Sequence, residues 1–142
     1  MNNLQTVLIV EDQPHHLRLI RDNLIDAGYN TIEATNVEEA LKQIREQSGK
    51  SQPPRVVLID VGIPESSGAE TSREGGITLL RRLHDEEKMQ IPAIFVTIWA
   101  EEPPVKKAAQ KYKVPIVPKP LDIDQLLRET RKALRRKQQG RL

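Results

Sequence analysis

The sequence predicts an α/β fold, a doubly wound parallel sheet of five strands with helices on both faces. Short continuous apolar runs alternate along the chain with segments whose apolar residues recur at helical spacing. The chain has 142 residues, the usual size of one domain with a proper core. Only 3% of the residues are aromatic, so this core must be built mainly from Ile, Leu and Val.

The first predicted strand and helix lie within residues 6–28. The run TVLIV at 6–10 has the continuous apolar character of a buried strand. Pro14 suits the first turn of the helix that follows, and Gly28 suits its C-terminal end. The apolar residues between them share one helical face: Leu17, Ile20, Leu24 and Ala27.

The second unit consists of a strand at 32–35 and a helix that begins after Asn36. Asn36 is a favourable N-cap, and Glu39 has the spacing that lets its side chain reach back in a capping box. Apolar side chains then recur along the helix at Val37, Ala40, Leu41 and Ile44.

Three more units complete the pattern. The predicted strands are 55–59, 93–97 and 115–117, and the helices are 77–86, 104–112 and a long final helix after Asp122. Asp122 and Gln125 repeat the capping-box spacing at the start of this final helix. Its apolar face consists of Ile123, Leu126, Leu127, Thr130, Ala133 and Leu134. We expect one domain over residues 1–137, with 138–142 as a basic tail or the start of a linker.

The composition excludes several kinds of protein. No cysteine is present, so the chain has no disulfide, no thiolate metal site and no cysteine nucleophile. The start of the chain, MNNLQTVLIVED, lacks the charged region and long apolar segment of a signal peptide. No apolar run approaches the roughly 20 residues needed to cross a bilayer. We therefore expect a cytoplasmic protein without membrane contacts.

Polar side chains follow three of the predicted strands, where such a sheet concentrates its chemistry. Glu11 and Asp12 end the first strand, Asp60 ends the third and Thr97 ends the fourth. With the strand order 2-1-3-4-5 these strands are neighbours, so their polar ends converge. Carboxylates that meet in one pocket repel each other unless a cation neutralises them, and a cluster of oxygen ligands suits Mg²⁺.

Four motifs at the strand ends carry a family resemblance. VLIVEDQP supplies an acidic pair, VLIDVGIP an acid and a proline, IFVT a threonine, and VPKP the pair Lys119 and Pro120. In this order the motifs resemble the receiver domain of two-component response regulators, as found in chemotaxis receivers, over nearly the whole chain. The resemblance implies a flavodoxin-like (βα)5 fold with the strand order 2-1-3-4-5.

The resemblance also implies the role of each site residue. Asp60 would accept a phosphoryl group from a sensor histidine kinase or a phosphotransfer protein. Thr97 would hydrogen-bond that group, Lys119 would pair with it, and the Lys119–Pro120 peptide would be cis. The implied Mg²⁺ ligands are Glu11, Asp12, Asp60 and the backbone carbonyl of Gly62. Such a protein is a phosphoacceptor rather than an enzyme, and phosphorylation switches its contacts with a downstream protein, an effector domain or a second copy of itself.

The chain departs from the family pattern at three places. The polar, Gly-rich and Ser-rich segment 64–76 is longer than the connection usual in the family, and a surface loop is the favoured interpretation over a cover or partner site. Ile98 stands where a small residue is usual, which predicts restricted access to Asp60. Ile116 replaces the aromatic residue whose rotation usually accompanies movement of the threonine.

The sequence is also compatible in part with functions other than phosphorelay. A receiver-like module that binds proteins without phosphorylation is favoured by the insertion, Ile98 and Ile116, and opposed by the complete set of acids, threonine and lysine. A haloacid-dehalogenase-type phosphatase needs a second acid where Gly62 stands, and a dinucleotide-binding domain needs a Gly-rich first turn.

The histidines and the basic C-terminal run receive no functional role. His15 and His16 are adjacent on a predicted helix, point about 100° apart and lack an evident third ligand, so both are interpreted as solvated. His84 is likewise interpreted as a surface residue. The basic run at 128–142 is interpreted as the solvated face and end of the last helix, and we do not expect nucleic-acid binding by this chain.

Overall fold

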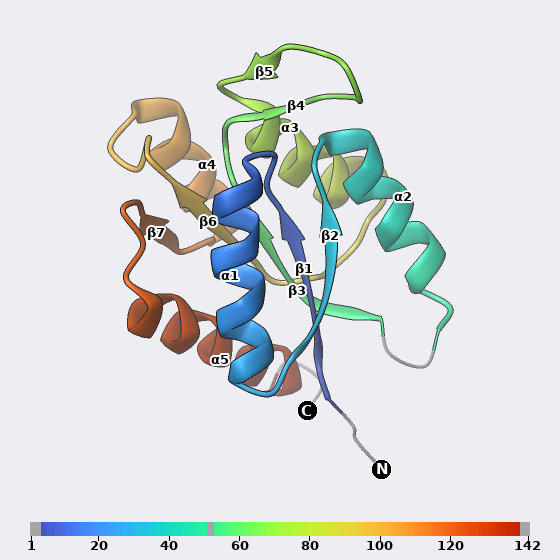
Figure 1. Cartoon of the computed structure of the whole chain (residues 1–142). Helices are drawn as coiled ribbons and strands as arrows, with labels where there is room; N and C mark the ends of the chain where they lie inside the picture. The colour runs from blue at the N-terminus through green and yellow to red at the C-terminus, as the bar shows by residue number, and fades with distance from the viewer. Residues whose placement is uncertain (1–3, 51–52, 140–142) are drawn as a thin grey trace.

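A five-stranded parallel sheet forms the centre of the molecule (Figure 1). The computed structural model describes residues 4–50 and 53–139, and within these ranges the strands of the sheet have the order β2-β1-β3-β6-β7. The strands are β1 (Thr6–Val10), β2 (Asn30–Ala34), β3 (Pro54–Ile59), β6 (Ala93–Thr97) and β7 (Ile116–Pro118). In order of their appearance in this sheet they follow the predicted 2-1-3-4-5 arrangement.

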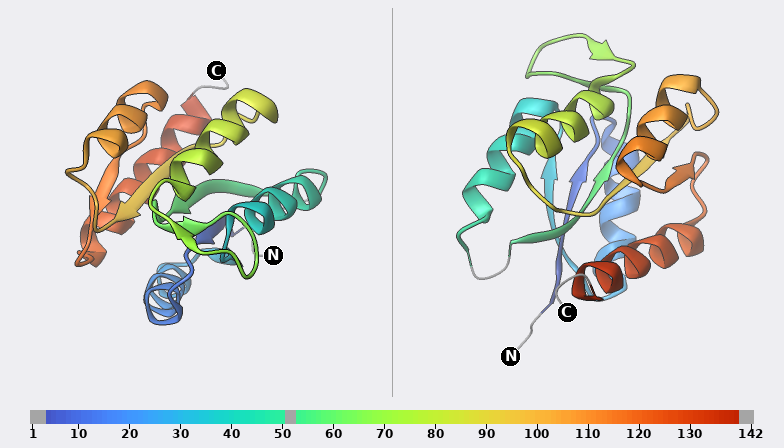
Figure 2. Two further views of the ribbon diagram at one scale, coloured as in Figure 1. Left: turned by 90° about the horizontal axis from the view of Figure 1, so that it is seen from above. Right: turned by 180° about the vertical axis from the view of Figure 1, so that it is seen from behind.

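Helices cover both faces of the sheet, as Figure 2 shows from above and from behind. On one face lie α1 (Pro14–Asp26) and α5 (Ile123–Gln139), and on the other lie α2 (Val37–Gln47), α3 (Gly75–Arg81) and α4 (Pro103–Tyr112). Successive strand residues face opposite layers: Val7 and Ile9 pack with α1 and α5, whereas Leu8 and Val10 pack with α2 and α3. The sheet is therefore buried on both sides, as the continuous apolar runs predict.

Local capping explains where two of the helices begin. The backbone N–H of Glu39 donates to Asn36 Oδ1 at 2.8 Å, which confirms the predicted N-cap of α2. The Glu39 carboxylate reaches back to the N–H of Thr35 at 2.8 Å, one residue earlier than a standard capping box. At α5, the N–H of Gln125 donates to Asp122 Oδ1 at 3.2 Å, as the sequence pattern predicts.

The element boundaries differ from the prediction by one or two residues at several places. The second strand begins earlier than predicted, at Asn30, and ends at Ala34. The third helix begins at Gly75 and continues into a π-helical turn, η1 (Arg82–Glu86), where the N–H of Glu87 donates to the carbonyl of Arg82. The last helix continues to Gln139, and the final three residues of the predicted tail lie outside the described residues.

The 64–76 insertion contains a small antiparallel hairpin of β4 (Ile63–Pro64) and β5 (Thr71–Ser72). It rises beyond the carboxyl edge of the main sheet (Figure 1). The N–H of Glu38, at the start of α2, donates to the carbonyl of Glu65 at 2.9 Å. At the other end of the insertion, a Cβ on Gly76 would lie 2.6 Å from the carbonyl oxygen of Asp60, so only glycine lets α3 start this close to the end of β3.

None of the helices in residues 4–50 and 53–139 combines the length and the apolar character needed to cross a bilayer.

Candidate functional site

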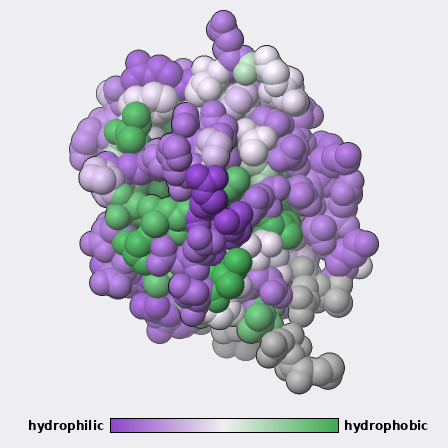
Figure 3. Space-filling model, in the orientation of Figure 1, coloured by the Kyte–Doolittle hydropathy of each residue, from purple (hydrophilic) through white to green (hydrophobic). Residues whose placement is uncertain are grey.

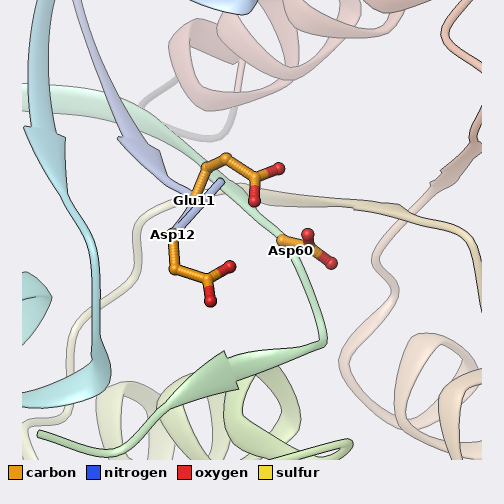
Figure 4. Close-up of side chains that lie close together, drawn as sticks. All are labelled: Glu11, Asp12 and Asp60. Atoms are coloured by element: carbon orange, nitrogen blue, oxygen red, sulfur yellow. The ribbon is translucent and has the colours of Figure 1, made fainter. Parts of the chain in front are cut away.

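The carboxyl ends of β1 and β3 bring three acidic side chains together, as predicted (Figure 4). Each of Glu11, Asp12 and Asp60 offers one carboxylate oxygen, and in the described part of the chain these oxygens lie within 4.8 Å of one another. Glu11 and Asp60 are buried, with 1% and 8% of their surface exposed. Their proximity follows from the register, because β1 and β3 are paired through Val10 and Ile59. Both strands therefore end at the same level of the sheet.

Lys119 supplies the positive charge in this acidic pocket. It follows β7, and its ammonium donates to Glu11 Oε1 at 2.7 Å and to Asp60 Oδ2 at 3.0 Å. The peptide bond between Lys119 and Pro120 is cis, as the resemblance implies. The lysine side chain is only 8% exposed, so its charge acts on the two carboxylates largely shielded from water.

Burial and charge change the pKa values of this pair. Burial of Glu11, reinforced by the negative charge of Asp60, raises the pKa of Glu11 to about 7, although the hydrogen bond from Lys119 acts in the opposite direction. Burial alone would lower the pKa of Lys119, but its hydrogen bond to Glu11 and the charge of Asp60 outweigh burial, and the pKa is raised. Lys119 is therefore a fixed ammonium, whereas Glu11 is poised between its two protonation states near neutral pH.

Asp12 and Asp60 differ in how their oxygens are satisfied. Asp60 Oδ1 accepts from the N–H of Gly62 at 3.2 Å, and Oδ2 is held by Lys119. Asp12 Oδ2 accepts from the hydroxyl of Thr71 at 3.3 Å, whereas Oδ1 is buried and has no hydrogen-bond partner among the described residues. A buried carboxylate oxygen without a donor is costly unless a cation approaches it. This oxygen and its acidic neighbours therefore fit a divalent metal ion such as Mg²⁺.

Thr97 connects the end of β6 to the lysine. Its side chain is fully buried, and its Oγ1 accepts from the N–H of Trp99 at 3.1 Å. Its carbonyl accepts from the N–H of Lys119 at 3.0 Å. The threonine lies at the third strand end named in the sequence prediction, and its hydrogen bonds tie together the two loops that carry Lys119 and Trp99.

Comparisons with known proteins agree with this geometry. The family described as response regulator receiver domain matches residues 7–131. The chain belongs to the response regulator receiver family. It is 31% identical, over 123 residues, to the polar-differentiation response regulator DivK of Brucella anthropi, and the match covers 87% of this chain and 90% of DivK. This chain is thus a receiver domain of two-component signalling.

Solved structures show the same fold at lower identity. The signal receiver domain of an HD domain-containing protein from Pseudomonas fluorescens Pf-5 matches with a TM-score of 0.78 and 22% identity, covering 96% of this chain and 99% of that one. A CheY-like response regulator receiver domain from Methanospirillum hungatei JF-1 matches with a TM-score of 0.77 and 22% identity, covering 97% and 99%. These neighbours confirm the flavodoxin-like (βα)5 fold.

His16 lies at the rim of the receiver's pocket: 43% of its side chain is exposed, in keeping with the interpretation as a solvated residue, but it also contacts Lys119, which the sequence did not predict. Its Nδ1 lies 2.8 Å from the Lys119 Nζ and 3.8 Å from Glu11 Oε1. Its neighbour His15 is exposed, as predicted, and so is His84. The helical spacing could have distinguished His16 from His15. His16 lies one turn before the buried Ile20, on the side of α1 that faces the sheet.

The hairpin and the loop after β6 meet at Trp99. The indole ring lies so close to Gly62 that a Cβ on that glycine would be 2.6 Å from the ring atom Cη2. The Arg73 guanidinium, which belongs to the insertion, lies 4.9 Å from the centroid of the Trp99 ring and pairs with Glu102 at 3.0 Å. Thr71 also contacts Asp12, so the insertion touches the acidic pocket as well as Trp99, while its residues 65–71 are exposed, as expected of a surface loop.

An apolar groove runs beside the pocket, between α1 and the segment after β7. It has a volume of about 400 Å³, and its lining includes Leu19, Ile98, Leu121 and, at the end nearest the pocket, His16 and Lys119. Figure 3 shows hydrophobic side chains gathered beside α1 on this face. Ile98 is 64% exposed and lines the groove, whereas Trp99 is the residue that lies against the chain next to Asp60.

Proposed function

We propose that this receiver accepts a phosphoryl group on Asp60 from a phosphohistidine of a sensor kinase or a phosphotransfer protein. The observation that carries the proposal is the pair of hydrogen bonds from Lys119 to Glu11 and Asp60, beside the partnerless Asp12 oxygen. A carboxylate oxygen of Asp60 forms the new O–P bond while the N–P bond of the phosphohistidine breaks, and the released imidazole takes up a proton. Such a transfer asks the protein mainly for positioning and charge neutralisation.

The residues divide this work between them. Glu11, Asp12, Asp60 and the carbonyl of Gly62 would hold Mg²⁺, which neutralises the charge on the phosphoryl oxygens when it is bound. Lys119 supplies a fixed positive charge to the same oxygens. The hydroxyl of Thr97 donates a hydrogen bond to the phosphoryl group, which moves that side chain toward Asp60.

The apolar groove supports a protein as the phosphoryl donor. A donor must bring its histidine next to Asp60, and the exposed side chains of Leu19 and Ile98 border that approach. Exposed apolar groups of this size are typical of a surface that packs against a partner. We propose that the donor places an apolar surface in the groove while its histidine reaches Asp60.

Two hydrogen bonds of Thr97 would transmit phosphorylation of Asp60 to the surface of the receiver. When the phosphoryl group draws the threonine inward, the N–H of Trp99 and the N–H of Lys119 are pulled through their bonds to its Oγ1 and carbonyl. The loops that bear Trp99 and Lys119 then present a different surface to a downstream protein or a second copy of the chain. Ile116, in place of an aromatic residue, packs partly buried against the core, so Trp99 is the aromatic side chain linked to the threonine.

A phosphorylation-independent binding module is the second candidate function. The contacts of Arg73 with Trp99 and Glu102 favour it, because they attach the loop after β6 to the insertion before any phosphoryl group arrives. In that case a partner protein would recognise the insertion and the loop after β6 in one fixed conformation.

Phosphorylation of Asp60 separates the two functions. Wild type, Asp60→Asn and the control Asp124→Asn are incubated with acetyl phosphate and Mg²⁺, and their intact masses are measured under mild conditions. We expect a phosphate adduct on wild type and on Asp124→Asn, whose substituted residue is an exposed aspartate at the start of α5. An adduct of equal yield on Asp60→Asn would refute the assignment, and no adduct on any variant would favour the fixed module.

A further inference from the structure

Three acceptors surround the Lys119 ammonium, one for each of its protons. They are Glu11 Oε1 at 2.7 Å, Asp60 Oδ2 at 3.0 Å and His16 Nδ1 at 2.8 Å. An ammonium only donates hydrogen bonds, so the Nδ1 atom of His16 must be the unprotonated nitrogen of the ring. The geometry therefore requires the neutral tautomer of His16, with its proton on Nε2.

The surroundings of His16 favour this neutral form. A positive charge on the ring would lie 2.8 Å from the Lys119 ammonium and would be repelled by it. The ring lies in the first turn of α1, which starts at Pro14, and its side chain is 43% exposed. An imidazole fixed in this way offers an uncharged acceptor to the lysine.

The three acceptors are not equivalent once the pocket performs its function. Glu11 and Asp60 are among the proposed metal ligands, and Asp60 also forms the bond to the phosphoryl group. His16 is the one acceptor of Lys119 that neither task requires. It also competes weakly for the ammonium, because a neutral nitrogen attracts it less than a carboxylate does.

We propose that His16 is a positioning residue for Lys119. Its Nδ1 holds one proton of the ammonium, so that the other two stay directed at Glu11 and Asp60, the acids beside which the phosphoryl group would be bound. Because it orients the charge before the donor arrives, His16 increases the rate at which Asp60 is phosphorylated. This inference rests on the proposed function only for its effect on phosphorylation. The hydrogen bond itself is independent of that function.

The first experiment observes the hydrogen bond in the protein without any phosphoryl donor. Long-range proton–nitrogen NMR of the imidazole rings reports which nitrogen of His16 carries the proton. We expect the Nε2–H tautomer in wild type, and a change of the Nδ1 resonance in Lys119→Met that His15 does not share. A proton on Nδ1 in wild type, or a His16 signal indifferent to Lys119→Met, would overturn the proposal.

The second experiment measures the effect on the site. His16→Leu removes the acceptor, His16→Asn keeps an oxygen at a comparable distance from the backbone, and His15→Leu makes the same change one residue away. We expect His16→Leu to reduce the phosphorylation rate by acetyl phosphate by about fivefold, the size expected for one hydrogen bond of this kind. His16→Asn should restore most of the rate, and His15→Leu should match wild type.

Binding measurements distinguish positioning from general damage to the fold. Beryllofluoride binding, followed by fluorine NMR, should weaken in His16→Leu, while calorimetry shows the same Mg²⁺ affinity as wild type because His16 is not a proposed metal ligand. Equal losses in His16→Leu and His16→Asn would refute the positioning role. If wild type takes up no phosphoryl group at all, the proposed function fails, and the tautomer measurement alone still decides whether His16 holds Lys119.

Discussion

The guanidinium of Arg73 lies 4.9 Å from the centre of the Trp99 indole ring, which joins the insertion to the loop that follows β6. The two residues come from segments on either side of the acidic pocket. Trp99 in turn donates its backbone N–H to the hydroxyl of Thr97. The threonine is therefore linked through the backbone of Trp99 to the indole and to the arginine beside it.

Trp99 fluorescence should report occupation of the pocket. Trp99 is the only tryptophan in the sequence, so its emission can be assigned without substitution. We expect Mg²⁺ with beryllofluoride to change the emission saturably and Mg²⁺ alone to change it less, because only the phosphoryl analogue attracts the Thr97 hydroxyl. Flat emission while fluorine NMR shows bound beryllofluoride would mean that the loop does not switch.

Removal of Arg73 should loosen the contact between the insertion and Trp99. We expect Arg73→Ala to increase quenching of Trp99 by acrylamide, since a cation over this partly buried ring shields it and contributes modestly to its position. The control Arg81→Ala removes an arginine of a different exposed ion pair, with Glu86, and should leave quenching unchanged. Similar quenching in wild type and Arg73→Ala would show that the cation does not hold the ring.

Loss of either acid that follows β1 should weaken Mg²⁺ binding. We expect Glu11→Ala and Asp12→Ala to lower the affinity by about tenfold or more, because each removes one charged oxygen ligand. Asp22→Ala, at an exposed position on α1, serves as the control. Calorimetry that gives wild-type affinity for both acid variants would argue against a metal site at these residues.

The Mg²⁺ affinity should also depend on pH through Glu11. Its pKa is raised from 4.5 to about 7 in the metal-free fold, so below that pH the carboxyl is largely protonated and the cation must displace a proton. The affinity therefore falls as the pH decreases below about 7 and levels off above it. In Glu11→Gln this dependence should be much weaker, and an identical pH profile in both proteins would exclude Glu11 as its source.

Access to Asp60 should depend on Trp99 more than on Ile98. The prediction from the sequence was that Ile98 restricts access, but this side chain is 64% exposed and lines the groove, whereas Trp99 lies against Gly62. We expect Trp99→Ala to speed phosphorylation by acetyl phosphate more than Ile98→Ala does. The opposite order of rates would restore the original interpretation of Ile98.

The sequence predicts the sheet well because its signals are local. Strands such as 93–97 are continuous apolar runs, and Asn36 caps its helix with atoms only three residues away. The acidic pocket is also predictable, since the order of parallel strands determines which of their ends are neighbours. Glu11, Asp12 and Asp60 converge for that reason.

Two features of the site depend on contacts that sequence patterns do not contain. His16 meets Lys119 across 103 positions of the chain, and a helical pattern does not specify which loop lies opposite its first turn. The hairpin at 63–72 has two-residue strands and no hydrophobic period, so its attachment to Asp12 and Trp99 comes from individual polar contacts such as that of Thr71.

The close packing of Trp99 on Gly62 also constrains how this protein can evolve. A side chain at position 62 would overlap the indole ring, so a mutation there requires the ring to move or position 99 to become smaller. Loss of the indole therefore makes room for a substitution at position 62. Among close relatives that keep the insertion, we expect tryptophan at 99 to occur with glycine at 62, and larger residues at 62 to occur only beside a small residue at 99.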